Sequence, residues 1–340
     1  MNLLVLGGMR FLGRAVLESA LAQGHRITLF NRGRSAAPPA GVEHLIGDRG
    51  GGLGVLDGRR FDAVIDTCGY VPRVVGDAAR RLAGTVNHYV FVSSISVYAG
   101  HAPHQGEDAP LATLENPAVE EITGATYGGL KALCERAAED VMPGRVAVVR
   151  AGLIVGPHDY TDRFPYWVRH MAGDTETLAP GRPDAPVQVI DVRDLAAWLI
   201  RLAATRTPGV FNATGPVEPL TLGPMLERLR DALGGRAPLT WVDEAFLLER
   251  GVVPFNELPL WVPEEAAGFQ KTDIRRALAA GLAFRPLAET ARHTHAWAAR
   301  RSDAERAAAQ GGLTGSTLPP ERERELLDAW HASAGAGRRT

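Results

Sequence analysis

Residues 2–13 read NLLVLGGMRFLG, and this stretch decides the fold of the chain. Four apolar residues at 3–6 predict a buried strand, and the two glycines that follow predict a tight turn. From residue 11 onward the apolar side chains recur at the spacing of a helix, which we expect to run through residues 14–23. A strand, a glycine turn and a helix in this order point the free N–H groups of the helix N-terminus at a phosphate. We therefore interpret the stretch as the pyrophosphate site of a dinucleotide.

The following residues alternate between predicted strands and predicted helices, which is typical of a parallel sheet covered on both faces. Strands are expected at 25–30, 42–46, 61–67, 88–94 and 145–149, with one more sheet strand near 209–212, and helices at 72–83, 125–141 and 195–202. The expected fold class is α/β, a Rossmann-type doubly wound parallel sheet with a smaller C-terminal substrate lobe.

The domain boundary is expected just after the sixth strand, because residues 152–157 open a region richer in Pro, Trp and Tyr. We expect a dinucleotide-binding Rossmann domain at 1–155. Residues 156–330 then form mainly the substrate-binding lobe, with some segments returning to the sheet, and 331–340 form a flexible tail. A polar loop at 99–123 is long enough to suggest a functional role.

Composition excludes several classes of protein. The chain has 340 residues, 22% of them charged, and a net charge of -2. No apolar run approaches the roughly 20 residues of a membrane span. We expect no signal peptide, because the apolar run at residues 2–6 is too short for one and leads directly into the glycine motif. The weak net charge argues against nucleic acid as a partner. We expect a cytoplasmic protein without a metal site, whose two cysteines, Cys68 and Cys134, are reduced and structural.

Three residues suggest catalysis: Ser94 at the end of a strand, and Tyr127 and Lys131 on the helix that follows. A tyrosine and a lysine four residues apart share one helix face, and a cation there lowers the pKa of the phenol. The phenol can then exchange a proton with a hydroxyl or carbonyl, while the serine holds the same oxygen. The alternative is an ordinary surface pair. The order glycine motif, strand-end serine and tyrosine–lysine helix favours the catalytic interpretation.

At this point the sequence resembles the short-chain dehydrogenase/reductases, and specifically their extended and atypical members, the NAD-dependent epimerase/dehydratases. The motifs that carry the resemblance are GGMRFLG (7–13), GDR (47–49), TCG (67–69), FVSSISVY (91–98), YGGLK (127–131), RAGLIVGP (150–157) and VIDVRDLA (189–196). Together they extend over more than half of the chain. The resemblance also implies a homodimer, formed through the 125–141 helix and its predecessor.

The resemblance assigns roles to individual residues. It implies that Ser94, Tyr127 and Lys131 are the catalytic set and that Lys131 also holds the nicotinamide ribose. In the cofactor site the amides of Phe11 and Leu12 would meet the pyrophosphate. Others in that site are the turn glycines Gly7 and Gly13, the adenine neighbours Asp48 and Arg49, and the strand-end residues Thr67, Cys68 and Gly69.

Two departures from the family pattern bear on ligands. Arg10 stands where the glycine motif has its middle glycine, and the atypical branch of chloroplast stem-loop RNA-binding proteins has a similar GGxRFxG. Val187 stands where nucleotide-sugar enzymes carry an arginine for the diphosphate, which weakens the case for a UDP- or TDP-sugar substrate. Arg163 and Arg182 are the candidates to replace that arginine.

The residues at the end of the second strand bear on the choice between NAD and NADP. An acidic residue there binds the ribose diol of NAD, whereas a basic one accommodates the 2′-phosphate of NADP. This chain has Asn31 and Arg32 at that place, with Arg34 nearby and Arg10 across the turn. We therefore favour NADP, with NAD as the alternative.

Substrate contacts are expected from the serine after the fourth long strand and from polar and aromatic residues beyond the sixth, where open α/β sheets bind ligands. The candidates are Ser96, His158, Arg163, Tyr166, Trp167 and Arg182. Asp194 is expected to cap the helix at 195–202. Trp241 and Trp261 are expected to serve packing, with closure of a lid as the alternative for Trp261.

The leading functional hypothesis is an NADP(H)-dependent oxidoreductase that interconverts a carbonyl and a secondary alcohol on a polar small molecule. The alternative is an NAD-dependent epimerase or dehydratase of sugars or nucleotide sugars, in which the hydride returns to the substrate. A second alternative is a non-catalytic RNA-binding or scaffolding protein, suggested by GGMRFLG alone. Cofactor that copurifies, and activity without consumption of NADPH, would favour the epimerase.

Overall fold

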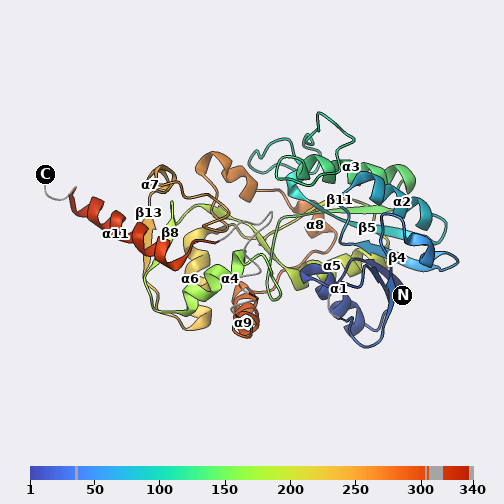
Figure 1. The fold of residues 1–340 in the computed structure, drawn as a ribbon, viewed down its shortest axis with the longest axis horizontal. Helices are drawn as coiled ribbons and strands as arrows, with labels where there is room; N and C mark the ends of the chain where they lie inside the picture. The colour runs from blue at the N-terminus through green and yellow to red at the C-terminus, as the bar shows by residue number, and fades with distance from the viewer. Residues whose placement is uncertain (35–36, 303–304, 306–316, 337–340) are drawn as a thin grey trace. The chain divides into compact units, whose positions relative to one another are not determined.

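The computed structural model describes residues 1–34, 37–302, 305 and 317–336 (Figure 1). The chain forms two compact units. Unit 1 comprises Met1–Ile154, Val189–Val217 and Thr272–Phe284, and unit 2 comprises Val155–Gln188, Glu218–Lys271 and Arg285–Thr340. Within the described ranges no helix is both long and apolar enough to cross a membrane.

Unit 1 is built on a seven-stranded sheet in the order β11-β6-β5-β4-β1-β2-β3. All six pairings in it are parallel. The strands are β1 (Asn2–Leu6), β2 (Arg26–Asn31), β3 (Val42–Ile46), β4 (Phe61–Asp66), β5 (Val86–Ser94), β6 (Val146–Ala151) and β11 (Gly209–Ala213). Because all strands run the same way, their carboxyl ends form one edge, which is where such sheets bind ligands. The predicted Rossmann-type fold is confirmed.

Helices cover both faces of this sheet, so unit 1 has three layers (Figure 1). The helices are α1 (Phe11–Ala22), α2 (Pro72–Leu82), α3 (Tyr127–Val141), α5 (Val192–Thr205) and α8 (Arg275–Ala279), with 3-10 turns η1 (Leu53–Leu56) and η2 (Ile95–Val97). Leu3 and Val5 of β1 pack in one core with α1 and α5, whereas Leu4 and Leu6 pack in the other with α2 and α3. A strand buried on both faces explains why β1 is continuously apolar.

Two details of unit 1 can be compared with the sequence prediction. The segment near 209–212 does return to the sheet, as β11 beside β6. The cap of α5 was assigned to the wrong aspartate, because the helix begins three residues earlier than expected, directly after β10 (Val189–Asp191). Asp191 is its N-cap and accepts a hydrogen bond from the Arg193 N–H at 2.8 Å. Asp194 lies in the first turn, where its charge complements the helix dipole.

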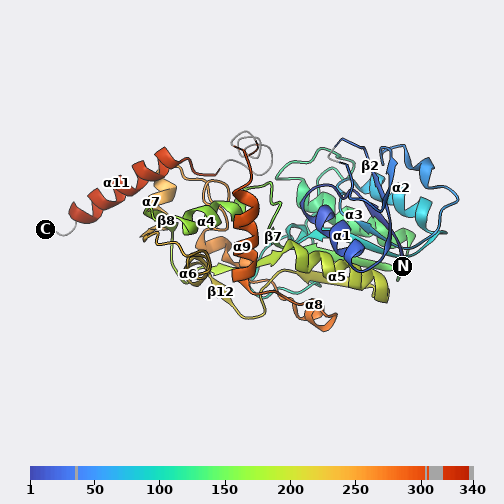
Figure 2. The ribbon, with the colours of Figure 1, turned by 90° about the horizontal axis from the view of Figure 1, so that it is seen from below.

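Unit 2 contains short strands and a group of helices. The strands are β8 (Thr177–Pro180), parallel to β13 (Leu239–Val242), and β9 (Pro186–Val187), antiparallel to β12 (Leu220–Thr221). Its helices are α4 (Arg163–Ala172), α6 (Leu222–Leu233), α7 (Glu244–Glu249), α9 (Leu287–Ala298), α11 (Pro320–Ala336) and the 3-10 helix η3 (Glu264–Gln270). Figure 2 shows α9 beside α4 and α6, which also contact each other. The short strand β7 (Leu153–Val155) ends where unit 2 begins. Of the expected tail, residues up to Ala336 are helical, and 337–340 lie outside the described residues.

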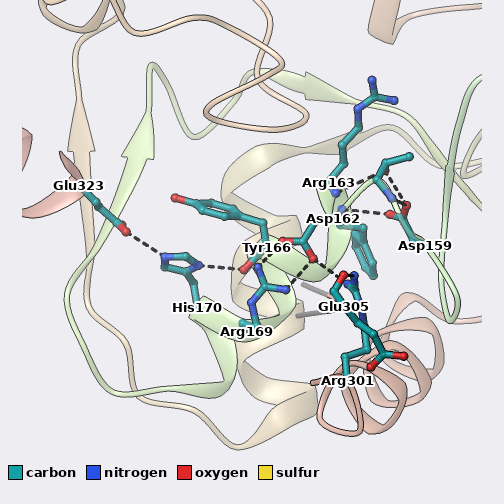
Figure 3. A network of polar contacts seen from close by, with 11 residues as sticks. Asp159, Asp162, Arg163, Tyr166, Arg169, His170, Arg301, Glu305 and Glu323 are labelled. Atoms are coloured by element: carbon teal, nitrogen blue, oxygen red, sulfur yellow. Dashed lines mark hydrogen bonds and ion pairs between the residues drawn. The ribbon is translucent and has the colours of Figure 1, made fainter. Parts of the chain in front are cut away.

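A network of polar contacts joins distant segments of unit 2 (Figure 3). Asp162, just before α4, accepts two hydrogen bonds from Arg169 at 2.8 and 2.5 Å and pairs with Arg301 at 3.4 Å. His170 contacts Glu323 of α11 at 2.9 Å, and the same carboxylate accepts a hydrogen bond from the Leu178 N–H. Polar contacts of Glu323, rather than apolar packing alone, therefore fix α11 against α4 and β8.

Candidate functional site

The glycine turn after β1 is closely packed. Gly7 and Gly8 have φ angles of +99° and +95°, a backbone region that residues other than glycine rarely adopt. A Cβ at Gly13 would lie 2.3 Å from the Gly8 Cα. The first turn of α1 therefore approaches the end of β1 at a distance that only glycine permits.

The N-terminus of α1 can accept an anion. The helix begins at Phe11, its first turn carries no acidic residue, and among the described residues no side chain caps it. Its N-cap residue is Arg10, whose backbone is extended and whose side chain is exposed. The N–H groups of a helix N-terminus beside a cationic side chain form an environment that favours phosphate. The sequence prediction and this geometry point to the same place.

Asn31 organises the end of β2. Its Nδ2 donates to the Gly7 carbonyl at 3.2 Å, and its Oδ1 accepts a hydrogen bond from the Gly33 N–H at 2.8 Å. These bonds tie the glycine turn to the loop that carries Arg32 and Arg34, both of which are exposed. The side chains beside the glycine turn therefore carry positive charge.

Arg49 makes a buried ion pair with Asp66 at the end of β4. Two guanidinium nitrogens lie 2.7 Å from the two carboxylate oxygens, and the Tyr89 hydroxyl also donates to this carboxylate at 2.7 Å. Burial raises the pKa of Asp66, but the Arg49 charge and these hydrogen bonds outweigh it and lower that pKa below its ordinary value. The Arg49 side chain thus fixes the strand end, while Asp48 is exposed and accepts a hydrogen bond from the Gly50 N–H.

The residues after β4 lie against the glycine turn. Thr67 Oγ1 donates to the Leu6 carbonyl at 3.0 Å, and a Cβ at Gly7 would lie 2.6 Å from that same Oγ1. The same added Cβ would lie 3.2 Å from the Cys68 sulfur, which accepts a hydrogen bond from Arg49. Thr67 and Cys68, both predicted cofactor neighbours, therefore lie beside Gly7.

Lys131 is buried between the ends of β4 and β5. Its ammonium donates to the carbonyls of Gly69 and Val92, both at 2.7 Å, and the residue is 3% exposed. Burial lowers the pKa of this ammonium to about 8. The lysine is held in one position and is charged at neutral pH.

Glycines at the start of α3 bring Tyr127 to the end of β5. A Cβ at Gly128 would lie 2.2 Å from the Ser96 carbonyl oxygen, so this helix start can approach η2 only without a side chain there. Ser94 lies at the same strand end, where its Oγ accepts a hydrogen bond from the Ser96 N–H at 3.1 Å. The three predicted catalytic residues, Ser94, Tyr127 and Lys131, therefore belong to adjoining elements at one edge of the sheet.

One aromatic residue at this edge was missed by the sequence analysis. The Tyr70 ring centroid lies 6.5 Å from that of Tyr127 and 5.2 Å from the Lys131 ammonium. The ring is therefore a candidate neighbour of any ligand at Tyr127. A signal was available, since Tyr70 directly follows the motif TCG at the end of β4.

The chain was compared with known proteins in sequence and in structure, and only the structural comparison found similar proteins. No model of a known protein family matches the chain, and no curated protein matches it in sequence. UDP-glucuronic acid 4-epimerase from Bacillus cereus in complex with NAD has a TM-score of 0.64 and 14% identity, over 88% of this chain and 99% of that one. MoeE5 in complex with UDP-glucose and NAD has a TM-score of 0.61 and 19% identity, also over 88% and 99%.

A third similar structure is the human epimerase family protein SDR39U1 with NADPH. Its TM-score is 0.57 and its identity 20%, over 87% of this chain and 99% of that one. This chain has the fold of these three proteins. The resemblance to short-chain dehydrogenase/reductases is thus confirmed at the level of fold.

Five of the six candidate substrate residues belong to unit 2. Tyr166 and Trp167 are 1% and 0% exposed, so their side chains serve the packing of that unit. His158 lies beside Trp297, with ring centroids 5.5 Å apart, and the Arg163 guanidinium lies 4.6 Å from the Phe255 ring centroid.

The remaining two candidates are Arg182, which is exposed, and Ser96. Arg182 of unit 2 pairs with Asp184 at 3.3 Å and with Glu264 at 3.1 Å. Ser96 of unit 1 is half-buried, and its Oγ accepts a hydrogen bond from the Ser94 hydroxyl at 3.1 Å.

A buried charge network lies behind this edge of the sheet, and the sequence motifs did not single it out. Arg150 of β6 pairs with Glu135 of α3 at 2.7 Å, and the Ser93 hydroxyl donates to Glu135 at 2.5 Å. Arg150 also donates to the Glu107 carbonyl at 2.8 Å, which ties the long loop after β5 to the sheet. An arginine inside an apolar strand was the available signal, because a charge buried there needs a partner.

Proposed function

We propose that this chain is an NAD(P)-dependent enzyme of the short-chain dehydrogenase/reductase type that oxidises a secondary hydroxyl group and returns the hydride to the same substrate. This is the chemistry of epimerases and dehydratases. The observation that carries the proposal is the buried Lys131 ammonium on the helix of Tyr127, at the strand end that bears Ser94. The solved structures of a UDP-glucuronic acid 4-epimerase with NAD and of MoeE5 with UDP-glucose and NAD support it over the net oxidoreductase that the sequence alone favours.

The residues of unit 1 fit a dinucleotide. Glycines at positions 7, 8 and 13 let the first turn of α1 pack directly against the end of β1. The N-terminus of α1, which no side chain among the described residues caps, would present N–H donors to a pyrophosphate. The amides of Phe11 and Leu12 would hold the phosphates, Thr67 to Gly69 would line the cofactor, and Lys131 would hold the nicotinamide ribose. Arg32 and Arg34 favour NADP, because a guanidinium accommodates a 2′-phosphate.

The protein groups would share the proton chemistry. A bound nicotinamide supplies hydride acceptance and donation. Tyr127 takes the proton of the substrate hydroxyl when that carbon is oxidised, and returns it when the carbon is reduced. The Lys131 ammonium stabilises the phenolate, and Ser94 donates a hydrogen bond to the reacting oxygen.

A cofactor-resolved assay tests this proposal. The protein would be incubated with stoichiometric NAD+ or NADP+ and a panel of secondary alcohols that includes free sugars and UDP-sugars. The proposal expects interconverted sugar isomers or dehydrated product in excess of the cofactor present, with no net accumulation of reduced cofactor. Binding of neither cofactor would contradict it.

The second candidate function is the net NADP(H)-dependent oxidoreductase. The observation that favours it is the basic loop at Arg32 and Arg34, since NADP(H) is the cofactor accommodated there. In the same assay it expects one mole of NADPH consumed for each mole of carbonyl reduced. The homodimer through α2 and α3 stays a prediction, which sedimentation of the full chain would test.

A further inference from the structure

Unit 2 contains a cavity that the proposed chemistry does not use. Its volume is about 220 Å³, far more than a single water needs. The residues around it come from the turn after β8, from β9, and from the starts of α6, α7 and η3. Those that matter here are Arg182, Val187, Asp243, Glu244, Trp261 and Glu264.

The cavity wall at Trp261 is held in place by buried side chains. The carbonyl of Pro259 accepts a hydrogen bond from the Trp167 indole at 2.7 Å, and the carbonyl of Leu260 accepts one from Gln270 at 3.3 Å. Leu260 has a φ of +68°, a conformation that persists in a non-glycine residue only where its surroundings enforce it. The position of Trp261 is therefore built into the fold of unit 2.

The indole N–H of Trp261 is a donor that faces this cavity. Trp261 is 2% exposed, and the part of the chain that the structure describes provides no hydrogen-bond acceptor for its N–H. A Cβ at Gly181 would lie 3.4 Å from Nε1, and Gly181 lines the cavity as well. Buried tryptophans usually pair this group. An oxygen of a ligand in the cavity would satisfy it.

The charges around the cavity are mainly negative. Arg182 pairs with Glu264 and with Asp184, so two carboxylates already neutralise the one cation. Asp243 and Glu244 add two more carboxylates to the lining. Carboxylates accept hydrogen bonds from hydroxyl and ammonium groups and repel phosphate. Val187, Leu222 and Leu260 supply apolar surface for a ring.

We propose that this cavity binds a small phosphate-free ligand, a hydroxylated ring of the monosaccharide type, and that it excludes nucleoside diphosphates. A ring oxygen or hydroxyl oxygen accepts the Trp261 N–H, and ring hydroxyls donate to Asp243 and Glu244. An amino group on the ring strengthens binding, because it meets net negative charge. The proposal goes beyond the proposed function and stands on the residues of unit 2 alone.

Ligand-detected NMR titrations of the full chain, without cofactor, test the proposal. The probes are methyl β-glucoside, glucosamine and UDP. We expect glucosamine to bind more tightly than the glucoside, and Trp261→Phe to weaken both about fivefold, which is the worth of one hydrogen bond. Trp241→Phe, on β13 and outside the cavity lining, is the matched control and should change neither.

A second variant keeps the test independent of core packing. Glu244→Gln, on the cavity rim, should remove most of the preference for glucosamine and leave glucoside binding within twofold. The proposal is overturned if Trp261→Phe folds and binds both sugars as the wild type does. It is also overturned if UDP displaces the glucoside. Tyr127→Phe should leave all these affinities unchanged, so failure of the proposed enzymatic function would be recognised separately.

Discussion

A Cβ added at Gly128 would lie 2.2 Å from the carbonyl oxygen of Ser96. The start of α3 and the end of β5 therefore meet without an intervening side chain. Because Tyr127 precedes this glycine and Ser94 precedes Ser96 by two residues, the contact sets the spacing of the two proposed catalytic residues. The glycines of YGGLK are thus part of the site, although they carry no reactive group.

Gly128→Ala should damage both stability and activity. The Ser96 carbonyl belongs to the backbone of η2, directly after β5, and cannot give way as a flexible side chain would. Helix α3 must therefore shift, at a cost of about 1–3 kcal/mol. Denaturant unfolding measures the cost, and turnover measures the displacement of Tyr127. Gly124→Ala is the control, since a Cβ there would meet nothing within 4 Å. Equal stability of the two variants would contradict this account of the contact.

The stability contributed by Lys131 should depend on pH. Burial lowers its pKa from the ordinary 10.5 to about 8, so between these values the unfolded state binds more protons than the folded state. Stability therefore rises with pH through that window, and below about pH 8 the full burial penalty is present. Across that window the free energy of unfolding of the wild type should rise relative to that of Lys131→Met, by up to about 1.4 kcal/mol per pH unit. Urea unfolding of both proteins at pH 7 and pH 10 measures this gain, and a pH-independent difference would argue against a lowered pKa.

The double variant Arg32→Glu/Arg34→Glu should lose its preference for NADP. The added carboxylates repel a 2′-phosphate and can bind a ribose diol, so the ratio of NADP to NAD affinity should fall at least about tenfold, or 1.4 kcal/mol. Calorimetric titration with each cofactor gives the ratio. Arg80→Glu/Arg81→Glu on α2 is the control for net charge. If the ratio of NADP to NAD affinity fell equally in this control, the effect would come from net charge and not from the loop at residues 32–34.

Breaking the buried pair of Glu135 and Arg150 should be costly. Glu135→Gln leaves a buried guanidinium, 4% exposed, without its counter-charge, and should destabilise unit 1 by about 3–5 kcal/mol. Glu18→Gln is the matched control, because its ion pair with Arg14 is solvent-exposed and such pairs are worth about 0–1 kcal/mol. Thermal unfolding compares them. Similar losses in both would mean that the buried network contributes little.

Local sequence patterns were sufficient to predict much of the fold of unit 1. The apolar run of β1 and the glycine turn are short-range features, so their strand, turn and helix could be inferred from spacing. The buried network could not, since Glu107 accepts a hydrogen bond from the Asn212 N–H over 105 residues of sequence. The α5 cap was misassigned because Asp191 and Asp194 are both good N-cap residues, and only the strand ending at Asp191 decides between them. The recruitment of Thr272–Phe284 into unit 1 likewise depends on tertiary packing alone.

Transfer of deuterium from labelled cofactor is the most direct test of the central claim, that Tyr127 acts in redox chemistry beside a dinucleotide. The experiment would follow label from 4-deuterated NADPH or NADH into a carbonyl substrate, in a single turnover, for the wild type and Tyr127→Phe. The account predicts labelled product from the wild type, a rate about 100- to 10,000-fold lower in the variant, and equal cofactor affinity in both. Equal rates of transfer in the two proteins, or no cofactor binding by the wild type, would contradict it.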